Sequence, residues 1–90
     1  MKTFDDLLFE DSPEGIKRAK MKFGNYTLSV ILEPPKSLYE IAIFNDEGRF
    51  IQLPGIHRVP QEEEDWIDDV IPYLSPDAVT GIMKKLQSLR

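Results

Sequence analysis

Hydrophobic and polar residues alternate most clearly along residues 17–33, which read KRAKMKFGNYTLSVILE. Two strand-like runs meet at Gly24-Asn25, a dipeptide suited to a two-residue hairpin turn, in which positive φ is needed. We expect Phe23 to pair with Tyr26 across this turn. In that register six side chains share one face, because side chains alternate along a strand with a period of two. They are Ala19, Met21, Phe23, Tyr26, Leu28 and Val30.

Residues 38–44, LYEIAIF, predict a third strand. The run is apolar on nearly both faces, which indicates an internal position in the sheet. Pro34-Pro35-Lys36-Ser37 should end the preceding strand, since proline donates no ladder hydrogen bond. Asn45-Asp46-Glu47-Gly48 predicts a type I turn followed by a left-handed glycine. A fourth strand is then expected over Arg49 to Leu53.

The residues before the hairpin allow two interpretations. Thr3 could cap a short helix, or residues 7–10 could form a strand at the edge of the sheet. The stretch Ser12-Pro13-Glu14-Gly15 has proline and glycine where a type I turn prefers them. We therefore favour the short edge strand.

The C-terminal third predicts two helices. Residues 62–71, EEEDWIDDVI, suit a short helix whose acidic start is favoured by the helix dipole, and Pro72 should end it. Ser75-Pro76 is a strong start for a longer helix, with serine as N-cap and proline at the first helical position. Apolar residues then follow at helical spacing as far as Leu89. Gly81 within this helix suggests close packing on the sheet.

These elements predict one small α+β domain over residues 1–90. Its antiparallel meander of four to five strands should pack against the C-terminal amphipathic helix, with the short acidic helix before it. No stretch approaches the roughly 20 apolar residues of a membrane span, and the acidic N-terminus does not resemble a signal peptide. The chain has no cysteine. We therefore expect a cytoplasmic protein that does not associate with membranes.

Few residues suggest catalysis. With one histidine, His57, and no cysteine, nucleophile–base pairs have almost no candidates. A lone histidine beside Gly55 and Ile56 is more typical of a surface or loop residue than of a base. No glycine-rich phosphate-binding motif is present. We expect no catalytic residues, no cofactor and no enzymatic activity.

The most unusual stretch is an acidic run around Trp66. Its carboxylates could hold a hard divalent cation through oxygen ligands, but the glycine and the ligand spacing of an EF-hand are missing. A solvated acidic face, or a surface that binds a basic protein partner, fits the run better, so no metal site is expected. Trp66 itself could instead belong to the core. The candidate partner-binding residues are Glu62, Glu63, Glu64, Asp65, Trp66, Asp68 and Asp69.

The face of the predicted hairpin opposite the core carries Arg18, Lys20 and Lys22, beside Thr27 and Ser29. This basic face could contact RNA or a phosphate. The formal net charge of −5 disfavours nucleic-acid binding, which depends on basic surface. An exposed face kept soluble by lysines is the interpretation we favour.

Three stretches carry a family resemblance. They are Ala19, Phe23, Asn25, Leu28, Ser29 and Val30; Tyr39-Glu40-Ile41-Ala42-Ile43; and Tyr73-Leu74-Ser75-Pro76-Asp77-Ala78-Val79. Together they resemble small uncharacterised proteins encoded by tailed bacteriophages and prophages. The chain departs from them in its Gly-Asn turn, where they have Asn-Gly, and in Pro72, where they have glycine. The resemblance implies a setting in the cytoplasm of a bacterial host, and no activity or functional residue.

Three functions follow in order of preference. The first is a non-catalytic phage-type accessory protein that binds a protein partner, with a host protein as one option. The second is a nucleic-acid-binding module that uses the basic face around Arg18, Lys20 and Lys22. The third is a carboxylate- or metal-dependent enzyme built on residues 62–69. The sequence does not indicate an oligomeric state.

Overall fold

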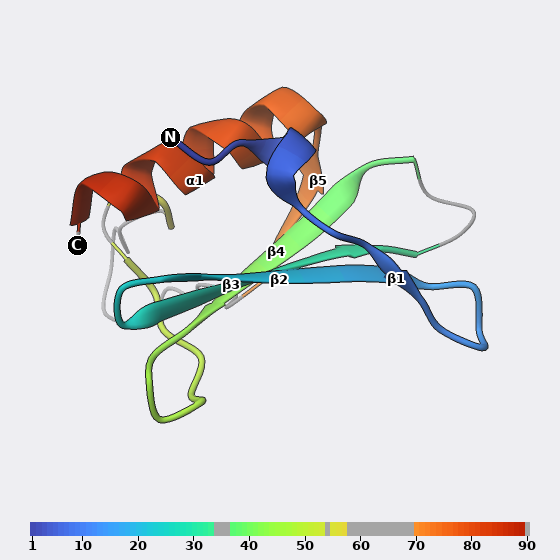
Figure 1. Ribbon diagram of the computed structural model, residues 1–90, viewed down its shortest axis with the longest axis horizontal. Helices are drawn as coiled ribbons and strands as arrows, with labels where there is room; N and C mark the ends of the chain where they lie inside the picture. The colour runs from blue at the N-terminus through green and yellow to red at the C-terminus, as the bar shows by residue number, and fades with distance from the viewer. Residues whose placement is uncertain (34–36, 54, 58–69, 90) are drawn as a thin grey trace, which may run out of the picture.

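The computed structural model describes residues 1–33, 37–53, 55–57 and 70–89. A five-stranded antiparallel sheet has one helix lying across one of its faces (Figure 1). Each strand pairs with the next strand along the chain, so the sheet is a meander and the predicted α+β class is confirmed. The elements are η1 (Phe4–Asp6), β1 (Glu10–Asp11), β2 (Lys17–Phe23), β3 (Tyr26–Leu32), β4 (Tyr39–Phe44), β5 (Val70–Leu74) and α1 (Pro76–Leu89).

The hairpin between β2 and β3 has the predicted register. Phe23 pairs with Tyr26, and the ladder continues as far as Lys17 opposite Leu32. Gly24 has a φ of 60°, and the φ of Asn25 is not positive. Positive φ at the first central residue alone defines a type II′ turn, which favours glycine there and matches the twist of the strands.

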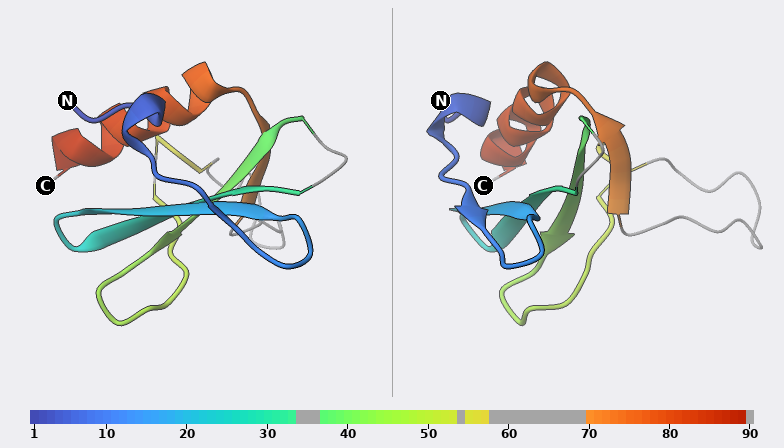
Figure 2. Two further views of the ribbon diagram at one scale, coloured as in Figure 1. Left: turned by 45° about the vertical axis from the view of Figure 1, so that its right-hand side comes forward. Right: turned by 90° about the vertical axis from the view of Figure 1, so that its right-hand side faces the viewer.

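The core lies between α1 and one face of the sheet, as the two rotated views in Figure 2 show. From α1 it takes Val79, Met83 and Leu86, which are fully buried and spaced as one face of a helix requires. From the sheet it takes the predicted apolar face of the hairpin together with alternate residues of β4. The buried sheet residues of this cluster are Ala19, Phe23, Leu28, Val30, Ile41 and Ile43.

Both interpretations of the N-terminal segment are present in the structure. The backbone N–H of Thr3 donates to Asp6 Oδ2 at 2.8 Å and so starts the short helix η1. The edge strand follows at Glu10–Asp11. It overlaps the predicted strand over residues 7–10 only at Glu10. Within η1, Phe4 N–H donates to Thr80 Oγ1 of α1 at 2.9 Å. The N-terminal segment is therefore anchored on the helix.

Two predicted turns and the start of α1 are confirmed by their hydrogen bonds, whereas the strand end expected at Pro34-Pro35-Lys36-Ser37 lies mostly outside the described residues. Gly15 N–H donates to the Ser12 carbonyl at 2.9 Å, and Gly48 N–H donates to the Asn45 carbonyl at 3.1 Å. Ser75 Oγ accepts a hydrogen bond from Ala78 N–H at 3.2 Å, as an N-cap does. In the part of the chain that the structure describes, no helix is long and apolar enough to span a membrane.

The predicted fourth strand over Arg49 to Leu53 is wrong. This stretch makes one bridge, Phe44 to Phe50, and Ile51 N–H donates to the Ile43 carbonyl at 2.9 Å. The rest of the outer side of β4 pairs with β5 instead. β5 and residues 49–53 therefore share one edge of β4. The part of that edge left for residues 49–53 is too short for them to form a strand.

The predicted acidic helix is wrong at its C-terminal end, because Val70 and Ile71 lie in β5. Residues 62–69 lie outside the described residues. Pro72 does not end the element as expected but lies inside the strand. Proline is tolerated there because β5 is an edge strand. The backbone groups of Ile71 face β4, so the nitrogen of the next residue, Pro72, faces outward, where no ladder hydrogen bond is needed.

Gly81 does not pack closely on the sheet, contrary to the prediction. It is exposed on α1, and a Cβ added there would have no neighbour within 4 Å. We expect Gly81→Ala to raise the free energy of unfolding by about 1 kcal/mol, because alanine has the higher helix propensity. Urea denaturation followed by circular dichroism measures this difference.

Gly48→Ala is the matched control. An added Cβ there also meets nothing within 4 Å, but Gly48 has a φ of 79°. Left-handed backbone costs a residue with a Cβ about 1–2 kcal/mol, so this variant should be less stable than the parent. The same sign of change in both variants would contradict the assignment of the two effects to backbone conformation.

Candidate functional site

An irregularity between β4 and β5 shapes one exposed edge of the sheet. Ile41 pairs with Ile71 and Tyr39 pairs with Leu74, so two residues of β5 lie opposite the single residue Glu40. This arrangement is a β-bulge, which re-aims side chains and occurs often near functional sites. The bulged residues of β5 are Pro72 and Tyr73.

Tyr73 has an unfavourable backbone conformation. Its φ is 62°, a value that no other described non-glycine residue approaches, and its side chain is 75% exposed. Tyrosine in the left-handed region costs about 1–3 kcal/mol, whereas glycine or asparagine would adopt the same conformation more easily. An exposed ring recovers little of this cost by burial, so the choice of tyrosine here is not explained by stability.

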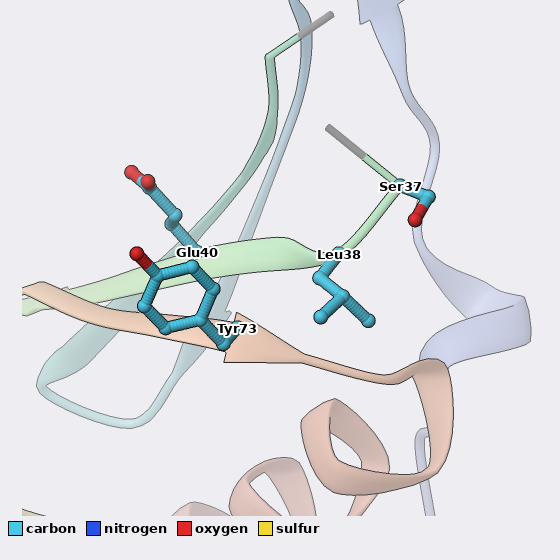
Figure 3. A pocket seen from close by; sticks show the side chains of 4 residues that line it. All are labelled: Ser37, Leu38, Glu40 and Tyr73. Atoms are coloured by element: carbon cyan, nitrogen blue, oxygen red, sulfur yellow. The ribbon is translucent and has the colours of Figure 1, made fainter. Parts of the chain in front are cut away.

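The Tyr73 ring lies beside Glu40 at a shallow pocket, as Figure 3 shows. Leu38, which is 39% exposed, and Ser37 also line this pocket of about 190 Å³. Small-molecule sites usually enclose 300–1,000 Å³. The combination of an aromatic ring, an aliphatic side chain and a carboxylate suits contact with a protein side chain better than it suits enclosure of a substrate. We call the surface formed by Leu38, Glu40 and Tyr73 the Tyr73 surface.

The predicted partner-binding residues lie outside the described residues. They are Glu62, Glu63, Glu64, Asp65, Trp66, Asp68 and Asp69, and their role stays a prediction. In the sequence Asp69 directly precedes Val70, the first residue of β5. The acidic run is thus covalently adjacent to the strand that carries Tyr73.

The basic face lies on the side of the sheet opposite α1. Arg18, Lys20 and Lys22 are exposed on β2 as predicted, but Ser29 is only 4% exposed and is not accessible to a large ligand. The structure adds an aromatic pair that the sequence did not indicate. Phe44 and Phe50 have ring centroids 4.5 Å apart, and Phe50 is 51% exposed.

Lys20, Lys22 and Phe44 line one open depression together with Thr27 and the Asn45–Gly48 turn. A basic groove bordered by an aromatic ring is the combination used by sequence-tolerant single-stranded nucleic-acid binders. Asp46 also lines the depression and lowers its positive potential.

His57 is a loop residue as predicted, but it is buried, with 5% of its surface exposed. Its Nδ1 accepts a hydrogen bond from Leu53 N–H at 3.0 Å, and its own backbone N–H donates to the Leu53 carbonyl at 2.8 Å. Lys85 Nζ donates to the neighbouring Gly55 carbonyl at 2.6 Å and joins this loop to α1. These bonds give His57 a structural role in the turn.

Side chains that could bind a metal ion do not form a cluster in the part of the chain described here. Over residues 1–33, 37–53, 55–57 and 70–89, no three histidine, cysteine, aspartate or glutamate side chains are placed to hold an ion. Tyr73 is the candidate residue that the sequence did not indicate. A proline followed by tyrosine carries no signal for positive φ, which arises from pairing with β4.

We expect His57→Leu to lower the free energy of unfolding by about 1 kcal/mol, because the Leu53 N–H loses its acceptor in a half-buried turn. His57→Asn is the matched variant, since an asparagine Oδ1 can take the place of Nδ1 and should recover part of the loss. Thermal melting of both variants measures the difference. Equal losses would show that the hydrogen bond to Leu53 is unimportant.

Comparisons of the chain with protein-family models, with curated proteins and with solved structures found no match.

Proposed function

We propose that this chain is a non-catalytic accessory protein that binds a protein partner through the Tyr73 surface and the acidic run next to it in sequence. The observation that carries the proposal is the exposed ring of Tyr73 at a φ of 62°. Strained backbone at an exposed aromatic residue is a reason to infer function, because stability alone would select another residue.

The energetics of interfaces support this use of Tyr73. Tyrosine is enriched among the residues that contribute most to protein–protein binding, since it buries a large ring and loses few rotatable bonds. A bulge that fixes the backbone also fixes the direction of the ring before binding. Preorganisation of this kind lowers the entropy lost on association.

The charge near the Tyr73 surface indicates the chemistry of the partner. Glu40 lies beside the ring, and six carboxylates occur between Glu62 and Asp69. A basic partner surface would complement the acidic run, and Tyr73 could also contact a cationic side chain through its ring face. The resemblance to phage-encoded proteins favours a bacterial host protein as this partner.

A second candidate function is single-stranded nucleic-acid binding on the basic face. The pair Phe44–Phe50 beside Lys20 and Lys22 favours it, because bases stack on exposed rings while lysines contact phosphates. The net charge of −5 opposes it. An oligonucleotide titration at two salt concentrations would reveal this function as salt-dependent binding.

We expect Tyr73→Asn to lower affinity for the partner at least tenfold while thermal stability stays equal or rises. The affinity falls because a contact ring is lost, and asparagine tolerates the left-handed conformation. The partner is first isolated by affinity capture from a bacterial lysate, and its dissociation constant is then measured by calorimetry. Leu8→Asn removes another exposed apolar side chain, 86% exposed, and should leave affinity unchanged. Equal affinities for both variants and the parent would exclude the Tyr73 surface.

The acidic run gives an independent expectation. Replacing Glu62, Glu63 and Glu64 with glutamine should slow association with the isolated partner and flatten its dependence on salt, because fewer carboxylates attract the basic surface. Stopped-flow or surface-binding kinetics at two ionic strengths measure this change. An unchanged association rate would mean that these carboxylates only keep the domain soluble.

A further inference from the structure

One edge of the sheet is open along most of β2. β1 pairs only with Lys17 and Arg18, whereas β2 continues to Phe23. The chain before β1 rises away from the sheet to η1, which lies beside α1 (Figures 1 and 2). Within the described ranges, no segment pairs with Lys20 or Lys22 on this outer side.

The hairpin register determines which backbone groups face this edge. Phe23 and Tyr26 close a two-residue turn and form a hydrogen-bonded pair, so odd-numbered residues of β2 bond to β3. The N–H and C=O groups of Lys20 and Lys22 therefore face outward. Ser12 N–H donating to the Ile16 carbonyl at 2.9 Å shows that even-numbered residues of this segment do face the outer side.

The opposite edge of the sheet is not open in the same way. β5 carries Pro72, whose nitrogen faces outward and has no hydrogen to donate, and its bulge distorts the edge. Both features obstruct the addition of another strand. Of the two sides of the sheet, the side where β2 extends beyond β1 is thus the one with regular backbone groups to offer.

Each face beside the open edge has its own chemistry. Lys20 and Lys22 project on the face away from α1, and Lys17 and Arg18 add positive charge along the same strand. Half-buried Met21 projects on the other face, into a groove of about 460 Å³ beneath the N-terminal segment. The described residues that line this groove are Met1, Lys2, Asp6, Met21, Lys22, Phe23 and Gln87.

We propose that the β2 edge binds an extended, acidic segment of a partner protein as an added strand. Acidic residues two positions apart would pair with Lys20 and Lys22, and the apolar residue between them would enter the groove opposite Met21. A second copy of this chain is a poorer occupant, because an antiparallel pair of β2 edges would place lysines against lysines. This surface goes beyond the proposed function, and its charge is opposite to that of the acidic run.

The probe is an acetylated and amidated peptide, Thr-Val-Glu-Val-Glu-Val-Glu-Val-Thr. A peptide of the same composition with its three glutamates adjacent is the control. Nuclear magnetic resonance of the ¹⁵N-labelled full chain should show saturable shifts of the Lys20 and Lys22 amides below about 1 mM peptide. Hydrogen exchange of these two amides should slow on binding, since they become ladder donors. The clustered peptide should bind at least tenfold more weakly.

Lys20→Pro removes an outward N–H but no bond to β3, so it should lower affinity at least tenfold. Lys20→Gln keeps the N–H and should lose less affinity. Should Lys20→Pro fail to fold, the exchange measurement on the parent protein still tests the proposal.

Absence of saturation by 1 mM, equal binding of the clustered peptide, or shifts without slower exchange would each overturn the proposal. Tighter binding of an oligothymidine probe at the same amides would assign the lysines to nucleic acid instead. Tyr73→Asn should leave peptide binding unchanged, which separates this surface from the Tyr73 surface.

Discussion

The pairing of Phe23 with Tyr26 across Gly24 is the constraint on which the rest of the structure depends. A shift of one residue would move the apolar face of β2 to the side away from α1, because side chains alternate along a strand. Gly24 stabilises the correct register, since its φ of 60° is readily available to glycine. The same register that buries Ala19 and Phe23 under α1 also directs the backbone groups of Lys20 and Lys22 to the open edge. Core formation and edge chemistry are thus set by one turn.

The sequence predicted the parts of the fold that depend on local pattern. The hairpin register, the Asn45–Gly48 turn and the Ser75 cap each rest on residues close together in the chain, and all three are confirmed. The fifth strand was missed because its pairing partner, β4, lies about 30 residues earlier, and Pro72 argued against a strand. Proline is excluded from central strands only, and edge position is a tertiary property that a local pattern does not encode.

The candidate site was less predictable than the fold for a related reason. Positive φ at Tyr73 follows from the bulge, and the bulge follows from how β4 and β5 align at Tyr39 and Ile41. Nothing in the residue types near position 73 signals this alignment. The Phe44–Phe50 contact likewise depends on residues 49–53 crossing β4 by a single bridge. Lys20 and Lys22 could be assigned to one face from alternation alone, and the structure places them there.

The two candidate surfaces have opposite charge and lie on different strands of the sheet. β2 and β5 are separated by β3 and β4, and neighbouring strands lie about 4.8 Å apart, so the two edges are roughly 14 Å from each other. Screening at physiological ionic strength acts over about 8 Å. Glu40 itself lies on β4, only two strand spacings or roughly 10 Å from β2, so screening weakens but does not remove its interaction with the cations of β2. In low salt the screening length exceeds this separation, and binding at one edge should then influence binding at the other. Segregation of charge by strand lets a chain with a net charge of −5 retain a basic edge.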